Sequence, residues 1–323
     1  MTLILLALSL ALGSPSTERL GPTVSPALGV SDDERLSMAR QRIRDWDYEG
    51  ARILLDQIGL EASEEASYLY GVAWELDRQP RRAIRQYRRT LRQWPDGARS
   101  ADTRFRIAEA QGTLGHLRKA LRHIDALGDL DDYPSDDRTK VQLVEGIFTL
   151  QRGRVDEGLA LLQGPLTQAG PEVAPFYQAK ARAEITRAML ADAAALPITG
   201  PEERQIANLD RRAELIGRAE KQITLAALLQ QPEWVLEGLL LIGQAYEQVG
   251  DDLLDAPAPR ALSKDQRGAY KDIIQERVRV VWGKASRYYA QGLDVAERLG
   301  WESSRVTALR EALAQVEAKR SPP

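Results

Sequence analysis

Few side chains in this sequence have the types and spacing that catalysis or metal binding requires. The 323 residues include no cysteine and only two histidines, His116 and His123. Without cysteine the chain has no thiolate nucleophile, disulfide, iron–sulfur ligand or lipid-bearing cysteine. Neither histidine has a second imidazole or a cysteine at the spacing of a zinc site. The sequence therefore predicts no enzyme activity, no cofactor and no metal site.

One pair of neighbouring residues is similar to a catalytic motif. Glu302-Ser303 resembles the Glu-Ser pair of lytic transglycosylases, but the Gly-Leu-Met-Gln-like segment that follows in that family is absent. A helix start explains Glu302 better, because carboxylates favour the positive end of a helix. Acidic pairs such as Asp251-Asp252 are interpreted in the same way. The chain contains neither an oxygen-ligand metal loop nor a phosphate-binding glycine loop.

The strongest charged signal is a run of arginines. Seven arginines and no acidic residue lie between residues 78 and 92, although the whole chain has a net charge of −3, which indicates no broad nucleic-acid surface. On a helix, three- and four-residue steps place most of them on one face, where they can bind an acidic protein loop or a phospholipid headgroup. The alternative is a solvated face without a ligand. The candidate anion-binding face consists of Arg78, Arg81, Arg82, Arg85, Arg89 and Arg92.

The sequence pattern predicts that the arginines and histidines lie on or beside helices. Between Ser31 and Arg320, apolar residues recur three and four positions apart, and the period-2 alternation of strands is absent. Capping boxes at Ser31 with Glu34 and at Ser263 with Gln266 predict two sharp helix starts. The sequence therefore predicts an all-α protein.

A repeat organises the first half of the chain. Small residues recur in two columns twelve positions apart, and successive units are displaced by 32, 37 and 38 residues. Small side chains let two antiparallel helices approach to the short end of the ~8–10 Å interaxial range. The first column is Ala39, Gly71, Ala108 and Gly146, and the second is Ala51, Ala83, Ala120 and Gly158.

This pattern resembles the tetratricopeptide repeat (TPR) family. The unit at 64–97 is most similar, with the family's small, aromatic, small, aromatic and proline series at Gly71, Trp74, Ala83, Tyr87 and Pro95. The resemblance covers residues 31–164 as about four repeats and implies a TPR-like α-solenoid. An irregular α-helical continuation with longer helices is expected over 165–323, with a partial repeat near 234–250. A generic helical bundle is the alternative.

In TPR proteins the first helix of each unit lines a groove, and the resemblance implies the same here. The implied occupant is a peptide or helix segment of a partner. The family's asparagine-based carboxylate clamp is not expected, because the chain has one asparagine, Asn208, which lies outside the four repeats. The implied groove residues are Arg40, Tyr68, Val72, Glu75, Phe105, Glu109, Leu143 and Ile147.

The N-terminal segment predicts export. Residues 1–13 form an apolar run that is too short to cross a ~30 Å hydrocarbon core and that ends in an Ala-x-Gly pattern typical of signal-peptidase sites. A cleaved signal peptide is the main prediction, and an uncleaved anchor or a buried first helix are the alternatives. Residues 14–30 contain three prolines and predict a linker. We therefore expect a periplasmic or otherwise exported protein without a lipobox cysteine.

These features together favour an exported scaffold or adaptor in a bacterial cell-envelope assembly. The C-terminal half is also similar to envelope TPR proteins of adventurous gliding machinery, and this resemblance implies a motility-related role. The alternatives are a helical accessory or activator of a peptidoglycan-active enzyme, and a membrane-tethered structural subunit. The expected partners are other envelope proteins close to a membrane, and no nucleic acid. The sequence leaves the oligomeric state open.

Overall fold

The computed structural model describes residues 30–259 and 262–320. Every regular element in these two stretches is helical, with thirteen α-helices and one short 3₁₀ helix. This confirms the all-α prediction. The predicted signal peptide at 1–13 lies outside the described residues, as does the predicted linker at 14–30 except for its last residue. None of the described helices combines the length and the apolar character that crossing a membrane would need.

The described residues divide into two compact units at Arg154 and Val155. The helices of the first unit are α1 (Asp32–Arg44), α2 (Tyr48–Ile58), α3 (Glu64–Leu76), α4 (Pro80–Gln93), α5 (Ser100–Thr113), α6 (Leu117–Asp125), the 3₁₀ helix η1 (Leu130–Asp132) and α7 (Ser135–Gln151). The helices of the second unit are α8 (Val155–Gln168), α9 (Pro175–Ala194), α10 (Glu202–Ala227), α11 (Pro232–Asp255), α12 (Lys264–Leu299) and α13 (Ser304–Arg320).

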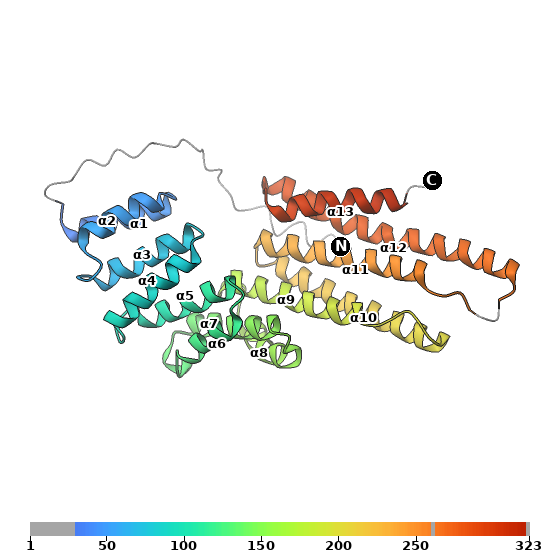
Figure 1. Ribbon diagram of the computed structural model, residues 1–323, viewed down its shortest axis with the longest axis horizontal. Helices are drawn as coiled ribbons and strands as arrows, with labels where there is room; N and C mark the ends of the chain where they lie inside the picture. Colours follow the sequence, from blue (N-terminus) through green and yellow to red (C-terminus); the bar gives the residue numbers. More distant parts are fainter. Residues whose placement is uncertain (1–29, 260–261, 321–323) are drawn as a thin grey trace. The chain divides into compact units, whose positions relative to one another are not determined.

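Helix pairs build the first unit in chain order (Figure 1). Helix α1 packs against α2, α3 against α4, and α5 against α6, and each pair contacts the next through α2 with α3, α4 with α5, and α6 with α7. All eight members of the two small-residue columns are buried. The contact between Gly71 of α3 and Tyr87 of α4 places one of these small residues at a helix crossing. The predicted fourth repeat spans the boundary between the units, with α7 in the first and α8 in the second.

The turn that follows the first helix of each repeat has one residue in the left-handed conformation. The φ angle is 64° at Trp46, 55° at Arg78, 73° at Gly115 and 79° at Gly153. These positions are separated by 32, 37 and 38 residues, the same displacements as in the small-residue columns. The spacing that repeats in the sequence therefore also repeats in the backbone conformation.

The non-glycine residues in these turns strain the backbone. A left-handed φ costs an ordinary residue about 1–2 kcal/mol, whereas glycine adopts it without a Cβ clash. We therefore expect Arg78→Gly to raise the free energy of unfolding by about 0.5–1 kcal/mol in urea denaturation. Gly115→Arg is the matched control, since no atom lies within 4 Å of a Cβ there, and it should lower stability. A loss of stability in Arg78→Gly would contradict the strain.

Longer helices build the second unit. Helix α12 has 36 residues and α10 has 26, compared with 13 in α3. The capping box predicted at Ser263 is present at the start of α12, and Gly300 ends that helix with a φ of 58°. The capping box at Ser31 is present at the start of α1. Helix α11 packs against α9, α10, α12 and α13, so it is the central helix of this unit.

A glycine, a tyrosine and a glutamate form a packing module at the α3–α4 crossing. The fully buried ring of Tyr87 lies directly over Gly71, where any Cβ would overlap the ring. The Tyr87 hydroxyl donates to Glu75 Oε2 at 2.6 Å, four residues after the glycine on α3. Glycine at this position therefore lets two helices approach with an aromatic ring between them.

The same module recurs at the α11–α12 crossing. The ring of Tyr289 lies over Gly243, and its hydroxyl donates to Glu247 Oε2 at 2.9 Å. The glutamate again follows the glycine by four residues, but the tyrosine follows it by 46 residues instead of 16. The α11–α12 hairpin thus repeats the α3–α4 packing with 30 additional residues between glycine and tyrosine. This packing involves the segment in which the sequence predicted a partial repeat.

A basic face on helices α4 and α6

The predicted groove residues lie on the first helices of the repeats, α1, α3, α5 and α7. The apolar members of the set are buried, each with at most 8 % of its surface exposed: Tyr68, Val72, Phe105, Leu143 and Ile147. Arg40 is exposed, and Glu75 and Glu109 are partly exposed. The apolar side chains therefore pack in the interior instead of forming an open trough. Contact with a partner at the three charged positions stays a prediction.

A polar network joins α3 to α5 on this side of the repeats. Arg106 Nε donates to the Tyr68 hydroxyl at 2.6 Å, and the same guanidinium lies 3.3 Å from carboxylate oxygens of Asp102 and of Glu75. The Tyr68 hydroxyl in turn donates to Asp102. Burial alone would raise the pKa of the Asp102 carboxyl, but Arg106 and the Tyr68 hydroxyl hold it below its ordinary value.

A second group of paired charges links three helices of the first unit. Glu65 of α3 accepts from Arg40 of α1 at 2.8 Å and from Arg99 Nε, beside the start of α5, at 2.6 Å. Burial alone would raise the pKa of the Glu65 carboxyl, but the two guanidinium groups lower it. The Arg99 backbone N–H also donates to Glu64 at 2.8 Å. Glu64 and Glu65 of α3 are therefore both satisfied within the protein.

The arginines of the predicted anion-binding face diverge in the structure. The Arg82 guanidinium lies 4.5 Å from the ring centre of Trp74, and Arg89 pairs with Glu61 at 2.5 Å, so both have internal partners. Four other arginines are exposed, and their side chains make no hydrogen bond or ion pair with any residue in 30–259 and 262–320: Arg78, Arg81, Arg85 and Arg92. Of these four, Arg78 lies in the turn before α4. The predicted face is therefore only partly available to a ligand.

Helix α6 extends the exposed positive charge. Arg88 of α4, which the sequence prediction left out, lines a hollow together with residues of α6. The three- and four-residue spacing of the α6 cations is a signal that sequence reasoning missed. We define the basic face as the exposed cations of α4 and α6 that have no ion-pair partner in the described part of the chain: Arg81, Arg85, Arg88, Arg92, Arg118, Lys119 and Arg122.

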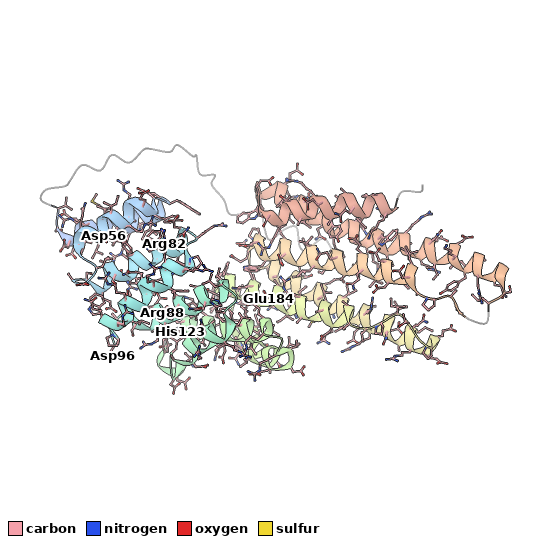
Figure 2. The ribbon with its side chains drawn as sticks, in the orientation of Figure 1. Asp56, Arg82, Arg88, Asp96, His123 and Glu184 are labelled. Atoms are coloured by element: carbon pink, nitrogen blue, oxygen red, sulfur yellow. The ribbon has the colours of Figure 1, made fainter. Side chains whose placement is uncertain are left out.

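The hollow between α4 and α6 has a volume of about 330 Å³. It is lined by Arg88, Lys119, Arg122 and the half-buried His123. Figure 2 labels Arg88 on α4 and His123 on α6. Burial lowers the pKa of the His123 imidazole, and the positive charges of Arg88, Arg122 and Arg104 lower it further. The walls of the hollow thus carry concentrated positive charge.

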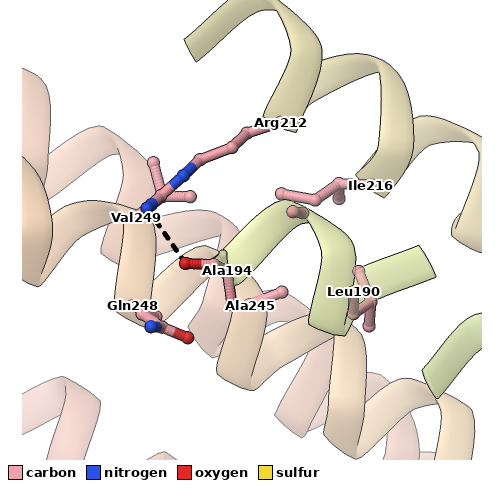
Figure 3. A pocket seen from close by; sticks show the side chains of 8 residues that line it. Leu190, Ala194, Arg212, Ile216, Ala245, Gln248 and Val249 are labelled. Atoms are coloured by element: carbon pink, nitrogen blue, oxygen red, sulfur yellow. Dashed lines mark hydrogen bonds between the residues drawn. The ribbon is translucent and has the colours of Figure 1, made fainter. Parts of the chain in front are cut away.

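A second hollow lies in the second unit, beside a buried arginine that connects two helices. It encloses about 10 Å³ between α9, α10 and α11 (Figure 3). Arg212 is 3 % exposed, donates to the backbone oxygens of Leu196 at 2.7 Å and Ala194 at 3.5 Å, and pairs with Asp252 at 2.5 Å. The guanidinium therefore satisfies carbonyl groups at the end of α9 and connects that end to α11.

Removing this arginine should weaken the second unit. We expect Arg212→Ala to lower the free energy of unfolding by about 2–4 kcal/mol, because buried carbonyl groups lose their donor and Asp252 loses its partner. Arg211→Ala is the matched control. Arg211 is exposed, and among the described residues it pairs only with Glu214 on the same helix, so its removal should cost about 0.5 kcal/mol or less in the same denaturation experiment. Equal losses in the two variants would contradict the structural role of Arg212.

The Glu302-Ser303 pair lacks the environment of a catalytic acid. Glu302 is exposed and accepts from Arg310 at 2.8 Å, and these hydrogen bonds lower the pKa of its carboxyl. A general acid needs the opposite shift, because it must hold a proton near neutral pH. Across the described residues, no three His, Asp or Glu side chains are grouped so that they could hold a metal ion.

No protein-family model and no curated protein matches the chain. Among solved structures, the chain is similar to the nearly identical TPR-like repeats described as a kinesin light chain from Podosopora anserina, with 14% identity and a TM-score of 0.41 over 59% of this chain and 96% of that one. It is also similar to a TPR repeats protein from Bacteroides fragilis, with 13% identity and a TM-score of 0.34 over 79% of this chain and 98% of that one.

The architecture follows from the chain's own geometry. The antiparallel helix pairs, the buried small residues at their crossings and the left-handed residue in each turn share one register. The protein therefore has a TPR-like fold, in which α-helix pairs are arranged as an α-solenoid and continue into longer helices.

Proposed function

We propose that this protein is a non-enzymatic scaffold that binds an acidic segment of a partner protein on the basic face of α4 and α6. The observation that carries the proposal is the contrast between two sets of charges. On α3 and α5, Glu65, Glu75 and Asp102 are paired with arginines inside the protein. The seven cations of the basic face are exposed and have no ion-pair partner in the described part of the chain.

Uncompensated positive charge on α4 and α6 favours a carboxylate-rich partner. Guanidinium groups bind carboxylates with two parallel hydrogen bonds, and several of them on one surface attract an acidic segment before contact. The exposed arginines of α4 follow steps of four, three and four residues, so they form one row along the helix. An extended or helical acidic segment matches a row of this kind better than a single carboxylate does.

The cellular setting of the proposal is a bacterial cell-envelope assembly. It is supported by the apolar run at 1–13 and the proline-containing segment at 14–30, and the similarity of the C-terminal half to envelope gliding proteins favours a motility-related assembly. Fractionation with N-terminal sequencing of the mature protein tests this setting. A periplasmic protein that begins near residue 14 supports it. A protein intact at Met1 in the membrane fraction favours a tethered structural subunit, and a cytosolic protein contradicts export.

Crosslinking and capture from the envelope of cells that make the protein tests the binding itself. The partner should be captured by the wild-type protein and lost from Arg81→Glu with Arg85→Glu. It should be retained by Arg277→Glu with Arg279→Glu, which reverses two exposed arginines of α12. Equal capture by all three proteins would contradict the assignment of the basic face.

A further inference from the structure

The hollow between α4 and α6 differs from the rest of the basic face because cations from two helices line it. Arg88 comes from α4, and Lys119, Arg122 and His123 come from α6. Its volume of about 330 Å³ lies at the lower end of the range of ~300–1,000 Å³ typical of small-molecule sites. Arg81, Arg85 and Arg92 of the same helix do not line it.

No carboxylate offsets the charge of this hollow. Within the described residues, Arg88, Lys119 and Arg122 make no ion pair, and the charged groups that influence His123 are Arg88 of α4, Arg104 of α5 and Arg122 of α6. Lys119 adds a further cation on the wall. Like charges that face one hollow repel one another, and this repulsion is relieved when a compact anion with several oxygens binds among them.

We propose that this hollow binds the phosphate group of a soluble ligand, a phosphomonoester or a diphosphate. Arg88 and Arg122 provide planar donor pairs from two different helices, which match the oxygens of a phosphate. Lys119 adds a point charge, and the His123 imidazolium adds an N–H donor. The four lining residues include no apolar side chain that could enter a lipid layer, which favours a soluble ligand over a lipid headgroup.

Phosphate binding and protonation of His123 should reinforce each other. Burial and the surrounding cations lower the pKa of His123 in the free protein. A bound phosphate favours the charged imidazolium and therefore raises that pKa, so a phosphate of fixed ionisation should bind more tightly when His123 is protonated. The binding site does not depend on the proposed scaffold function, because Arg81 and Arg85, which test that function, lie outside the hollow.

The two histidines make nuclear magnetic resonance a direct test. His123 lines the hollow, whereas His116 lies before α6, with Nδ1 3.0 Å from Gln111 Oε1, and serves as an internal control. The ring signals of the full chain are followed during titration with inorganic phosphate and with diphosphate, at constant ionic strength set with chloride. We expect a saturable shift of the His123 signals, a higher His123 pKa in the bound state, and no matching change at His116.

Matched variants separate the site from general charge. Arg88→Gln with Arg122→Gln should raise the dissociation constant about tenfold or more, whereas Arg81→Gln with Arg85→Gln removes the same charge and should change it less than about twofold. Lys119→Gln is a milder variant that should also weaken binding. It provides the test if the double variant fails to fold. A linear, unsaturable shift, equal losses in both double variants, or binding to phosphatidic acid vesicles without any response to the free anions would overturn the proposal.

Discussion

Replacing Tyr289 by alanine is expected to lower the free energy of unfolding of the second unit by about 3–5 kcal/mol. The Tyr289 ring is fully buried and fills the space over Gly243, a residue that has no side chain to close the resulting cavity. The neighbouring helix cannot collapse into that space without breaking its contacts along α11. Chemical denaturation followed by tryptophan fluorescence measures the loss. Tyr87→Ala should produce a loss of the same size in the first unit, because Tyr87 covers Gly71 in the same way.

The conservative variant separates packing from hydrogen bonding. Tyr289→Phe keeps the ring and removes only the hydroxyl that donates to Glu247. Glu247 still accepts from Lys319 at 2.8 Å, so this variant should cost about 1 kcal/mol. If Tyr289→Ala cost no more than Tyr289→Phe, the glycine–aromatic crossing would not be what holds α11 and α12 together.

The second large effect is expected on binding. Arg81→Glu with Arg85→Glu should weaken binding of the acidic partner about 100-fold or more, because each change replaces an attraction with a like-charge repulsion on the basic face. The loss should be largest at low ionic strength, where surface charges are least screened. Isothermal titration calorimetry or biolayer interferometry with the captured partner measures it over a range of salt concentrations.

The matched control lies in the other unit. Arg277→Glu with Arg279→Glu makes the same change in net charge at two exposed positions of α12 that have no ion-pair partner in the described part of the chain. Its affinity should stay within about threefold of the wild type. If both double variants lost affinity equally, net charge alone would explain binding and the basic face would have no special role.

The repeats were predictable from the sequence because their determinants are local. Small residues at crossings and capping boxes such as Ser31 with Glu34 act within one or two helices, and the structure places them as predicted. The α11–α12 module was harder to find. The 30 additional residues separate Tyr289 from Gly243, so a fixed repeat period does not align this pair with Tyr87 and Gly71.

The candidate site was only partly predictable, because side-chain pairing is not a local property. Helical spacing places Arg82, Arg85 and Arg89 on one face. However, Arg82 contacts the ring of Trp74 and Arg89 pairs with Glu61, and both partners lie outside α4. Conversely, Arg88 lines one hollow together with residues of α6, which the spacing within α4 does not reveal. Likewise, the sequence pattern of the first helices does not reveal which apolar side chains are buried. Val72, for example, was predicted to line the groove but is buried.

Site-specific photo-crosslinking tests most directly whether the basic face is the docking surface. A photoreactive amino acid is placed singly at positions 92 and 118 on the basic face, at position 40 on the first-helix side, and at position 279 on α12. We expect crosslinks from positions 92 and 118 into an acid-rich segment of one partner, and these crosslinks should be lost when Arg81 and Arg85 are changed to glutamate. Crosslinks to that partner mainly from position 40 or 279 would contradict it.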